Sequence, residues 1–204
     1  MTVDLIQRGY RLFAPFYDAV FGSSLQGSRR LAVESLHCQP GDRVLEVCVG
    51  TGMSLALFPP DVQVTGIDIS GEMLAKARAR VKRLGLRNVK ALERMDAEHL
   101  AFPDASFDKV AMLFALSGLP DPVRAAEEMR RVCRPGGTIV IAAHFRSRRP
   151  LVRLCEGLLS PIYRLLRYRA DLDLDEFLAR AGLDVREVKP ANLFDYSTIL
   201  VCRR

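Results

Sequence analysis

Short apolar runs alternate with amphipathic stretches along most of this chain. The apolar runs are typical of buried strands, and they occupy residues 44–49, 62–67, 88–92, 107–114 and 138–143. Between them, apolar positions recur at helical spacing in residues 28–36, 53–58, 70–84 and 121–132. Strands that alternate with helices predict a parallel sheet covered on both faces. Two further runs, 183–188 and 196–202, are separated by too few residues for a crossover, so we expect an antiparallel hairpin.

The first forty residues have a different character from the rest. Apolar and aromatic residues recur there at helical spacing, with a proline inside the pattern: Val3, Ile6, Tyr10, Phe13, Pro15, Tyr17 and Phe21. We expect amphipathic helices in residues 1–40, followed by one domain over residues 41–204. Such helices can form a lid packed on the domain or lie on a membrane surface, and both roles are compatible.

A glycine turn follows the first apolar run, at Gly50-Thr51-Gly52. Glycines there let backbone N–H groups approach a ligand closely. Asp68 ends the next strand about twenty residues later, the spacing at which nucleotide-binding units place a carboxylate on ribose hydroxyls. Leu55 stands where a dinucleotide fingerprint needs its third glycine, which disfavours a dehydrogenase.

The pattern Glu46-x-x-x-Gly50-Thr51-Gly52, with Asp68 after the next strand, resembles class I S-adenosylmethionine-dependent methyltransferases. Cys48 stands where that family usually has glycine. The family's later motifs are matched in order by Asp96-Ala97, Phe107-Asp108-Lys109-Val110 and Arg134-Pro135-Gly136-Gly137. The resemblance covers residues 43–204. It implies an α/β, Rossmann-like fold, with a seven-stranded, mostly parallel sheet ordered 3-2-1-4-5-7-6.

The resemblance also implies roles for individual residues in binding S-adenosylmethionine. Gly50 and Gly52 would let the loop pass the methionyl part, and Glu46 would fix the loop and reach the amino group. Asp68 would bind the ribose hydroxyls. The adenine would be held by Ile69, Asp96 and the Ala97 N–H, and the ammonium by the Phe114 carbonyl. Thr51 and Met73 complete this expected cofactor site.

Composition indicates what kind of protein this is and in which compartment it is expected. Hydrophobic residues make up 49% of the 204 residues, which suits a globular domain, and no apolar run is long enough to span a bilayer. The five cysteines form no C-x-x-C pair, so we expect neither disulfides nor a metal site. No secretory signal is apparent, and a cytoplasmic location fits best.

Residues 144–170 form a basic, apolar insertion after the fifth expected strand. From His144 to Arg169 there are seven arginines and one acid, Glu156, which matches the net charge of +6 for the whole chain. Leucines are interleaved with these arginines, whereas aromatic residues are few. Nucleic-acid binding by stacking is therefore disfavoured, and an anionic membrane surface with acyl chains suits the pattern better.

Two local sequence patterns indicate a particular group within this family. Tyr10-x-x-x-Ala14-x-x-Tyr17-Asp18, and Ala143-His144-Phe145 before the insertion, look like bacterial phospholipid N-methyltransferases, which convert phosphatidylethanolamine stepwise towards phosphatidylcholine. Quinone-ring C-methyltransferases share the Tyr-Asp element, but their acceptor has no phosphate for arginines to bind. An enzyme peripheral to the cytoplasmic membrane is expected.

The expected acceptor site combines proton transfer with recognition of the headgroup. The amine has a pKa near the ~10 of lysine and must lose a proton before it attacks a methyl group. Tyr17 and His144 are the candidate catalytic residues. The expected substrate-binding residues are Tyr10, Tyr17, His144, Arg146, Arg148 and Arg149.

Overall fold

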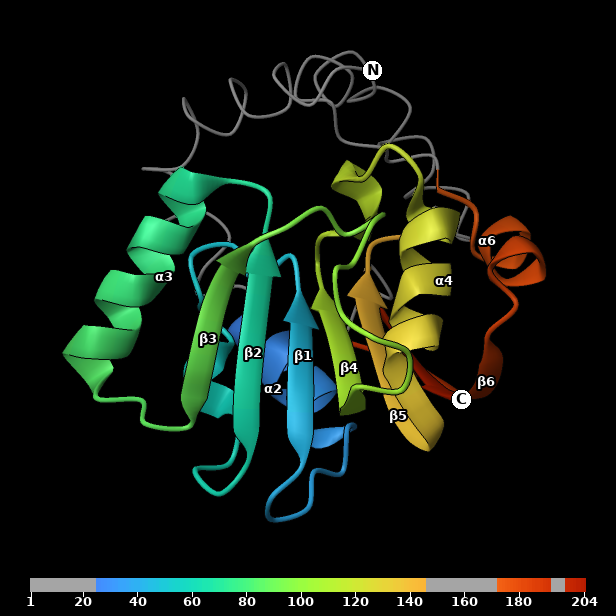
Figure 1. Ribbon diagram of the computed structural model, residues 1–204. Coiled ribbons are helices and arrows are strands. Elements are labelled where there is room, and N and C mark those ends of the chain that lie inside the picture. The colour runs from blue at the N-terminus through green and yellow to red at the C-terminus, as the bar shows by residue number, and fades with distance from the viewer. Residues whose placement is uncertain (1–24, 146–171, 192–196) are drawn as a thin grey trace.

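The computed structural model describes residues 25–145, 172–191 and 197–204, which form a twisted sheet covered by helices (Figure 1). The sheet has seven strands in the order β3-β2-β1-β4-β5-β7-β6, which confirms the expected topology. Strands β1 to β5 pair in parallel, and β7 pairs antiparallel with both β5 and β6. The strands are β1 Arg43–Val47, β2 Gln63–Asp68, β3 Val89–Arg94, β4 Phe107–Leu113, β5 Cys133–Ala143, β6 Asp184–Pro190 and β7 Thr198–Arg203.

Four α-helices lie in the described ranges: α2 Gln26–Glu34, α3 Gly71–Leu84, α4 Pro122–Val132 and α6 Leu174–Ala181. Residues suited to helix ends bound α3: the Ser70 hydroxyl accepts from the Met73 N–H, and Gly85 ends the helix with a φ of 63°. At α4 the Asp121 carboxylate caps the first turn, which begins with Pro122.

Side chains that alternate along each central strand build a core on both faces of the sheet. On β1, Leu45 and Val47 belong to the apolar cluster that includes α4 and α6. Val44 points the other way, into the cluster formed with α2 and α3. Because both faces are covered, the central strands are apolar at nearly every position. Figure 1 shows α2 and α4 on opposite faces of the sheet.

Three local features differ from the sequence-based expectation. The helical pattern at residues 53–58 forms only a short 3-10 helix, Leu55–Leu57, because the following Pro59 and Pro60 supply no N–H donors. The segment 134–137, which precedes the apolar run 138–143 expected as the fifth strand, already lies within β5, where the register with β4 is shifted. Helix α6 was not predicted, although Asp173 caps its first turn and Gly182 ends it.

The site-forming feature of this topology is the position of β1. Strands β2 and β3 lie on one side of β1, and β4 and β5 lie on the other side. The connections that leave β1 and β4 therefore run to opposite sides, which leaves a crevice beyond the carboxyl ends of these strands. The expected lid in residues 1–24 and most of the basic insertion lie outside the described residues, and the domain boundary at residue 40 stays a prediction. No helix in the described ranges is long and apolar enough to cross a membrane.

Candidate active site

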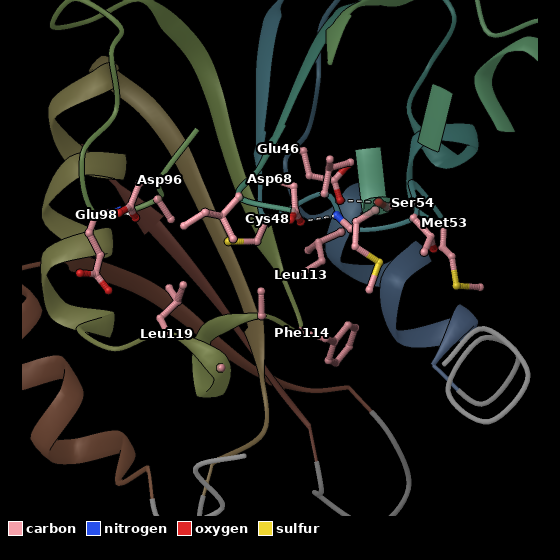
Figure 2. A pocket seen from close by; sticks show the side chains of 18 of the residues that line it. Glu46, Cys48, Met53, Ser54, Asp68, Asp96, Glu98, Leu113, Phe114 and Leu119 are labelled. Atoms are coloured by element: carbon pink, nitrogen blue, oxygen red, sulfur yellow. Dashed lines mark hydrogen bonds between the residues drawn. The ribbon is translucent and has the colours of Figure 1, made fainter. Parts of the chain in front are cut away.

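A pocket of about 230 Å³ lies at the carboxyl ends of β1, β2 and β4 (Figure 2). Every cofactor-binding residue expected from the sequence lines this pocket except Gly52. Its wall is built from segments far apart in the chain, which contribute Glu46, Asp68, Asp96 and Phe114. The sheet topology therefore brings the expected cofactor residues together at the switch point.

The Asp68 carboxylate holds the glycine loop in place. Its Oδ2 accepts from the Gly50 N–H at 2.8 Å, and its Oδ1 accepts from the Ser70 N–H at 2.9 Å. Burial raises the pKa of Asp68, while these backbone hydrogen bonds act in the opposite direction. An ionised carboxylate has about four lone-pair sites, so two backbone donors leave room for ligand hydroxyls.

Gly50 and Gly52 occupy different surroundings within the loop. Both have positive φ angles, 56° and 74°. A Cβ on Gly50 would meet nothing within 4 Å, whereas one on Gly52 would lie 2.8 Å from the Leu55 side chain and 3.1 Å from that of Ala77. Gly52 thus allows the loop to pack against α3, and Gly50 borders the pocket itself.

Glu46 is the most deeply buried acid of the pocket, with 2% of its surface exposed. Its Oε1 accepts a short hydrogen bond from the Ser54 hydroxyl (Figure 2). Its Oε2 has no hydrogen-bond partner among the described residues. Burial raises the pKa of Glu46 to about 7, against the opposing effects of Ser54 and Arg29. A buried carboxylate oxygen without a donor fits a ligand that brings an ammonium group to this wall.

Two non-glycine residues with left-handed backbone line the pocket. Cys48 (φ 58°) directly follows β1, and Phe114 (φ 61°) directly follows β4. Such conformations cost about 1–3 kcal/mol each and persist where the surroundings hold them. The position where the family usually has glycine therefore needs positive φ, and here a cysteine adopts it. Burial raises the pKa of the Cys48 thiol well above its usual value, so the thiol stays protonated.

Asp96 and Ala97 form the wall beyond β3. The Asp96 Oδ1 accepts from the Glu98 N–H at 2.9 Å, and its Oδ2 lies 3.7 Å from the His99 Nδ1. Ala97 is buried, while the Asp96 side chain is partly exposed. Asp96 thus has an ordered carboxylate facing a pocket of mixed polarity.

His144 lies just after β5, beside the pocket. Its ring centroid is 5.4 Å from that of Phe114, and its Nδ1 is 2.9 Å from the hydroxyl oxygen of the buried Ser197. The contact with Ser197 orients the imidazole. The other expected acceptor residues lie outside the described residues: Tyr10, Tyr17, Arg146, Arg148 and Arg149.

Sequence reasoning missed three polar residues of this site, Ser54, Arg29 and Glu98. Ser54 comes shortly after the glycine loop, and a hydroxyl at that position can reach back to the first strand, as this one does to Glu46. Arg29 lies on α2 and lines the pocket, but its sequence neighbourhood carries no signal for that role. Within the described ranges, no group of three or more histidine, cysteine or acidic residues is placed to hold a metal ion.

Comparison with known proteins agrees with this geometry. Residues 45–141 match the model of a family described as a methyltransferase domain. The chain is 42% identical over 200 residues to a phosphatidylethanolamine N-methyltransferase of Cereibacter sphaeroides, covering 96% of this chain and 97% of that protein. It is 38% identical over 115 residues to a demethylmenaquinone methyltransferase of Listeria welshimeri, covering 54% of this chain and 48% of that relative.

The fold is also found among solved structures. An S-adenosylmethionine-dependent methyltransferase from Aquifex aeolicus superposes with a TM-score of 0.63 at 22% identity, over 88% of this chain and 92% of that one. That likeness concerns the fold, and the family follows from the near full-length sequence match. The pocket, the topology and these matches agree: the chain belongs to the class I S-adenosylmethionine-dependent methyltransferases, and S-adenosylmethionine is its cofactor.

Proposed function

We propose that this protein transfers methyl groups to the amine of phosphatidylethanolamine and its methylated intermediates, towards phosphatidylcholine, at a membrane surface. One observation carries the proposal: the 42% identity to a phosphatidylethanolamine N-methyltransferase extends over 96% of the chain. A match of that extent cannot leave out either residues 1–24 or residues 146–171. These are the two segments in which acceptor recognition is expected.

A quinone-ring C-methyltransferase is the second candidate. It is favoured by the 38% identity to a demethylmenaquinone methyltransferase, but that match covers only 54% of this chain. The seven arginines between His144 and Arg169 also favour a phosphate-bearing acceptor, because a guanidinium binds a phosphate through two parallel hydrogen bonds. Neither a metal nor nucleic acid has a part in this proposal.

The pocket residues fit S-adenosylmethionine, which supplies a methyl group already activated by a sulfonium centre. Glu46 Oε2 would accept from the amino group, together with the Phe114 carbonyl. Asp68 would accept from the ribose hydroxyls. Ile69 and Met73 would cover the adenine, which Asp96 and the Ala97 N–H would bind at its edge. Thr51 would border the same ligand within the glycine loop.

Among the described residues, His144 is the one that we expect to contact the methyl acceptor. The contact of its Nδ1 with Ser197 orients the ring beside Phe114, and Phe114 lines the pocket. An imidazole nitrogen can accept a proton, so His144 can take the amine proton or, when protonated, bind the lipid phosphate. Tyr17 is the alternative proton acceptor, and its ring would also suit a methylated ammonium. Tyr10, Arg146, Arg148 and Arg149 would complete headgroup binding.

Transfer of a labelled methyl group tests the acceptor directly. The protein is incubated with labelled S-adenosylmethionine and vesicles of phosphatidylethanolamine with an anionic lipid, a demethylated menaquinone, or RNA. We expect label in methylated ethanolamine lipids. His144→Asn should slow the transfer, whereas His37→Asn, at an exposed histidine, should not. Label in the quinone alone would refute the lipid assignment and favour the second candidate.

A further inference from the structure

The loop between β3 and β4 forms one wall of the cofactor pocket. Asp96, Ala97 and Glu98 line the pocket, and Figure 2 shows the side chains of Asp96 and Glu98 on the same wall. Residues 95–106 lie between these strands and form neither helix nor strand. The regular hydrogen bonds of the sheet end before this loop, so its backbone groups need partners from elsewhere in the fold.

Two side chains of α4 are partners of the loop backbone. Glu128 accepts through Oε2 from the Leu100 N–H at 2.8 Å. The Arg131 guanidinium donates to the Leu100 carbonyl at 2.7 Å and to the Phe102 carbonyl at 2.8 Å. The Leu100 side chain is buried in the apolar cluster that includes α4. The middle of the loop is thus bound to α4 by three hydrogen bonds and by apolar packing.

Glu128 and Arg131 also bind each other. Glu128 accepts from the Arg131 Nε through Oε1 at 2.9 Å and from Nη2 through Oε2 at 2.8 Å, a bidentate geometry that orients both groups. Glu128 is 4% exposed, and the hydrogen bonds from Arg131 lower its pKa, so the carboxylate stays ionised at neutral pH. The helix itself is packed on the sheet through Ala125 and Met129. The pair therefore has a fixed position from which it binds the loop.

A second contact with α4 lies nearer to the pocket. The Glu98 Oε1 accepts from the Asp121 N–H at 2.8 Å, and the Glu98 carbonyl accepts from the Arg124 Nε at 3.3 Å. Glu98 directly follows Ala97, and its own N–H donates to the Asp96 Oδ1 at 2.9 Å. The contacts with α4 therefore determine where the Asp96 carboxylate and the Ala97 N–H lie in the pocket.

We propose that Glu128 and Arg131 are positioning residues for recognition of the adenine base, because they place the loop that presents Asp96 and Ala97 to it. The inference rests on the adenine contacts of Asp96 and Ala97 in the proposed function. The described lining of the pocket includes neither Glu128 nor Arg131, so both act through the loop. A displaced loop would lose the hydrogen bond between the adenine amino group and Asp96. The ribose and methionyl contacts, made by other segments, would stay.

Two ligands that differ at one position of the base separate this role from a merely structural one. S-Adenosylhomocysteine carries the 6-amino group that would donate to Asp96, whereas S-inosylhomocysteine carries an oxygen there, which the carboxylate would repel. Calorimetry measures both ligands with the unmodified protein, Glu128→Ala, Glu128→Gln and Arg131→Lys, and thermal unfolding reports whether each variant keeps the fold. Arg130→Lys is the matched control, because the adjacent, exposed arginine donates to the Gly182 carbonyl at the end of α6. No methyl acceptor is present, so the result is independent of which acceptor the enzyme uses.

The unmodified protein should bind S-adenosylhomocysteine at least about tenfold more tightly than S-inosylhomocysteine, since a hydrogen bond to a charged group is replaced by repulsion. Glu128→Ala should remove most of this preference by weakening S-adenosylhomocysteine, with little change for the analogue. Glu128→Gln, which keeps an acceptor for the Leu100 N–H, and Arg131→Lys should each lose part of the preference, and Arg130→Lys none. If Glu128→Ala does not fold, these two conservative variants measure the loss.

Equal weakening of both ligands would overturn the proposal and leave Glu128 and Arg131 as structural supports. A preference that is unchanged in every variant would overturn it as well. An unmodified protein without any preference between the two ligands would overturn it through the adenine contact of Asp96, and would leave the proposed acceptor untouched.

Discussion

The affinity of this enzyme for S-adenosylhomocysteine should depend on pH through Glu46. Burial raises the pKa of that carboxyl to about 7, and its Oε2 has no partner among the described residues. An ammonium beside Oε2 favours the ionised form, so binding should lower the pKa towards its ordinary value. Below about pH 7 binding then releases a proton, and the affinity must rise as pH rises.

The size of the effect follows from the two pKa values. If the bound carboxyl returned to its ordinary pKa of 4.5, affinity would rise roughly 50- to 100-fold between about pH 5 and about pH 8. The stability of the ligand-free protein should move the other way. Between these two pKa values the folded state binds more protons than the unfolded state, so the free energy of unfolding falls as pH rises, by about 3 kcal/mol in total.

Calorimetry across this pH range, in buffers of different ionisation enthalpy, measures both the affinity and the protons released. In Glu46→Gln the affinity should be lower at about pH 8 and nearly independent of pH, with no proton release assigned to this site. Glu93→Gln, at an exposed glutamate on β3, is the matched control and should behave as the unmodified protein. If Glu46→Gln kept the full pH dependence, the reasoning would be refuted and Asp68, whose pKa burial also raises, would be the source.

Three further predictions address the loop and the membrane contact. Asp68→Asn should weaken S-adenosylhomocysteine at least about tenfold by calorimetry, because a charged acceptor for two hydroxyls is lost; unchanged affinity would contradict its role. Gly52→Ala should lower the free energy of unfolding by about 1–3 kcal/mol, and Gly50→Ala by less, because only a Cβ at residue 52 would lie 2.8 Å from a side chain. Denaturant titration measures both losses, and equal losses would contradict a steric clash as the cause. Arg164→Glu with Arg167→Glu, in the segment outside the described residues, should reduce liposome flotation on anionic lipid without changing cofactor affinity; flotation indifferent to lipid charge would contradict membrane docking.

The central strands and the cofactor loop could be predicted because local patterns determine them, whereas the strand order followed from the resemblance to class I methyltransferases. Apolar runs set the central strands, and the caps Ser70, Gly85 and Asp121 set two helices. The two helices for which the prediction was wrong, at residues 53–58 and at α6, also have local causes. The consecutive prolines after Phe58 limit the expected helix to one 3-10 turn, and the signals that cap α6 at Asp173 passed unnoticed.

The polar lining of the pocket was harder to foresee. Glu46 and Asp68 stand at strand ends, where chain order places them at the switch point. Arg29 belongs to a helix whose rotation and depth depend on its packing against β4 and β5. No local pattern distinguishes it from the exposed Arg30, so its burial beside Phe114 is known only from the tertiary structure.

The identity of the methyl acceptor is tested most directly by analysing the lipids of a cell that expresses the enzyme. The chain is expressed in a bacterium whose membranes contain phosphatidylethanolamine and none of its methylated derivatives, with Asp68→Asn expressed as the control. Mass spectrometry of the extracted lipids should reveal new species whose ethanolamine headgroups carry added methyl groups, and these should be absent or much reduced with Asp68→Asn. An unchanged phospholipid spectrum, with a newly methylated quinone in the same extract, would contradict the proposed function.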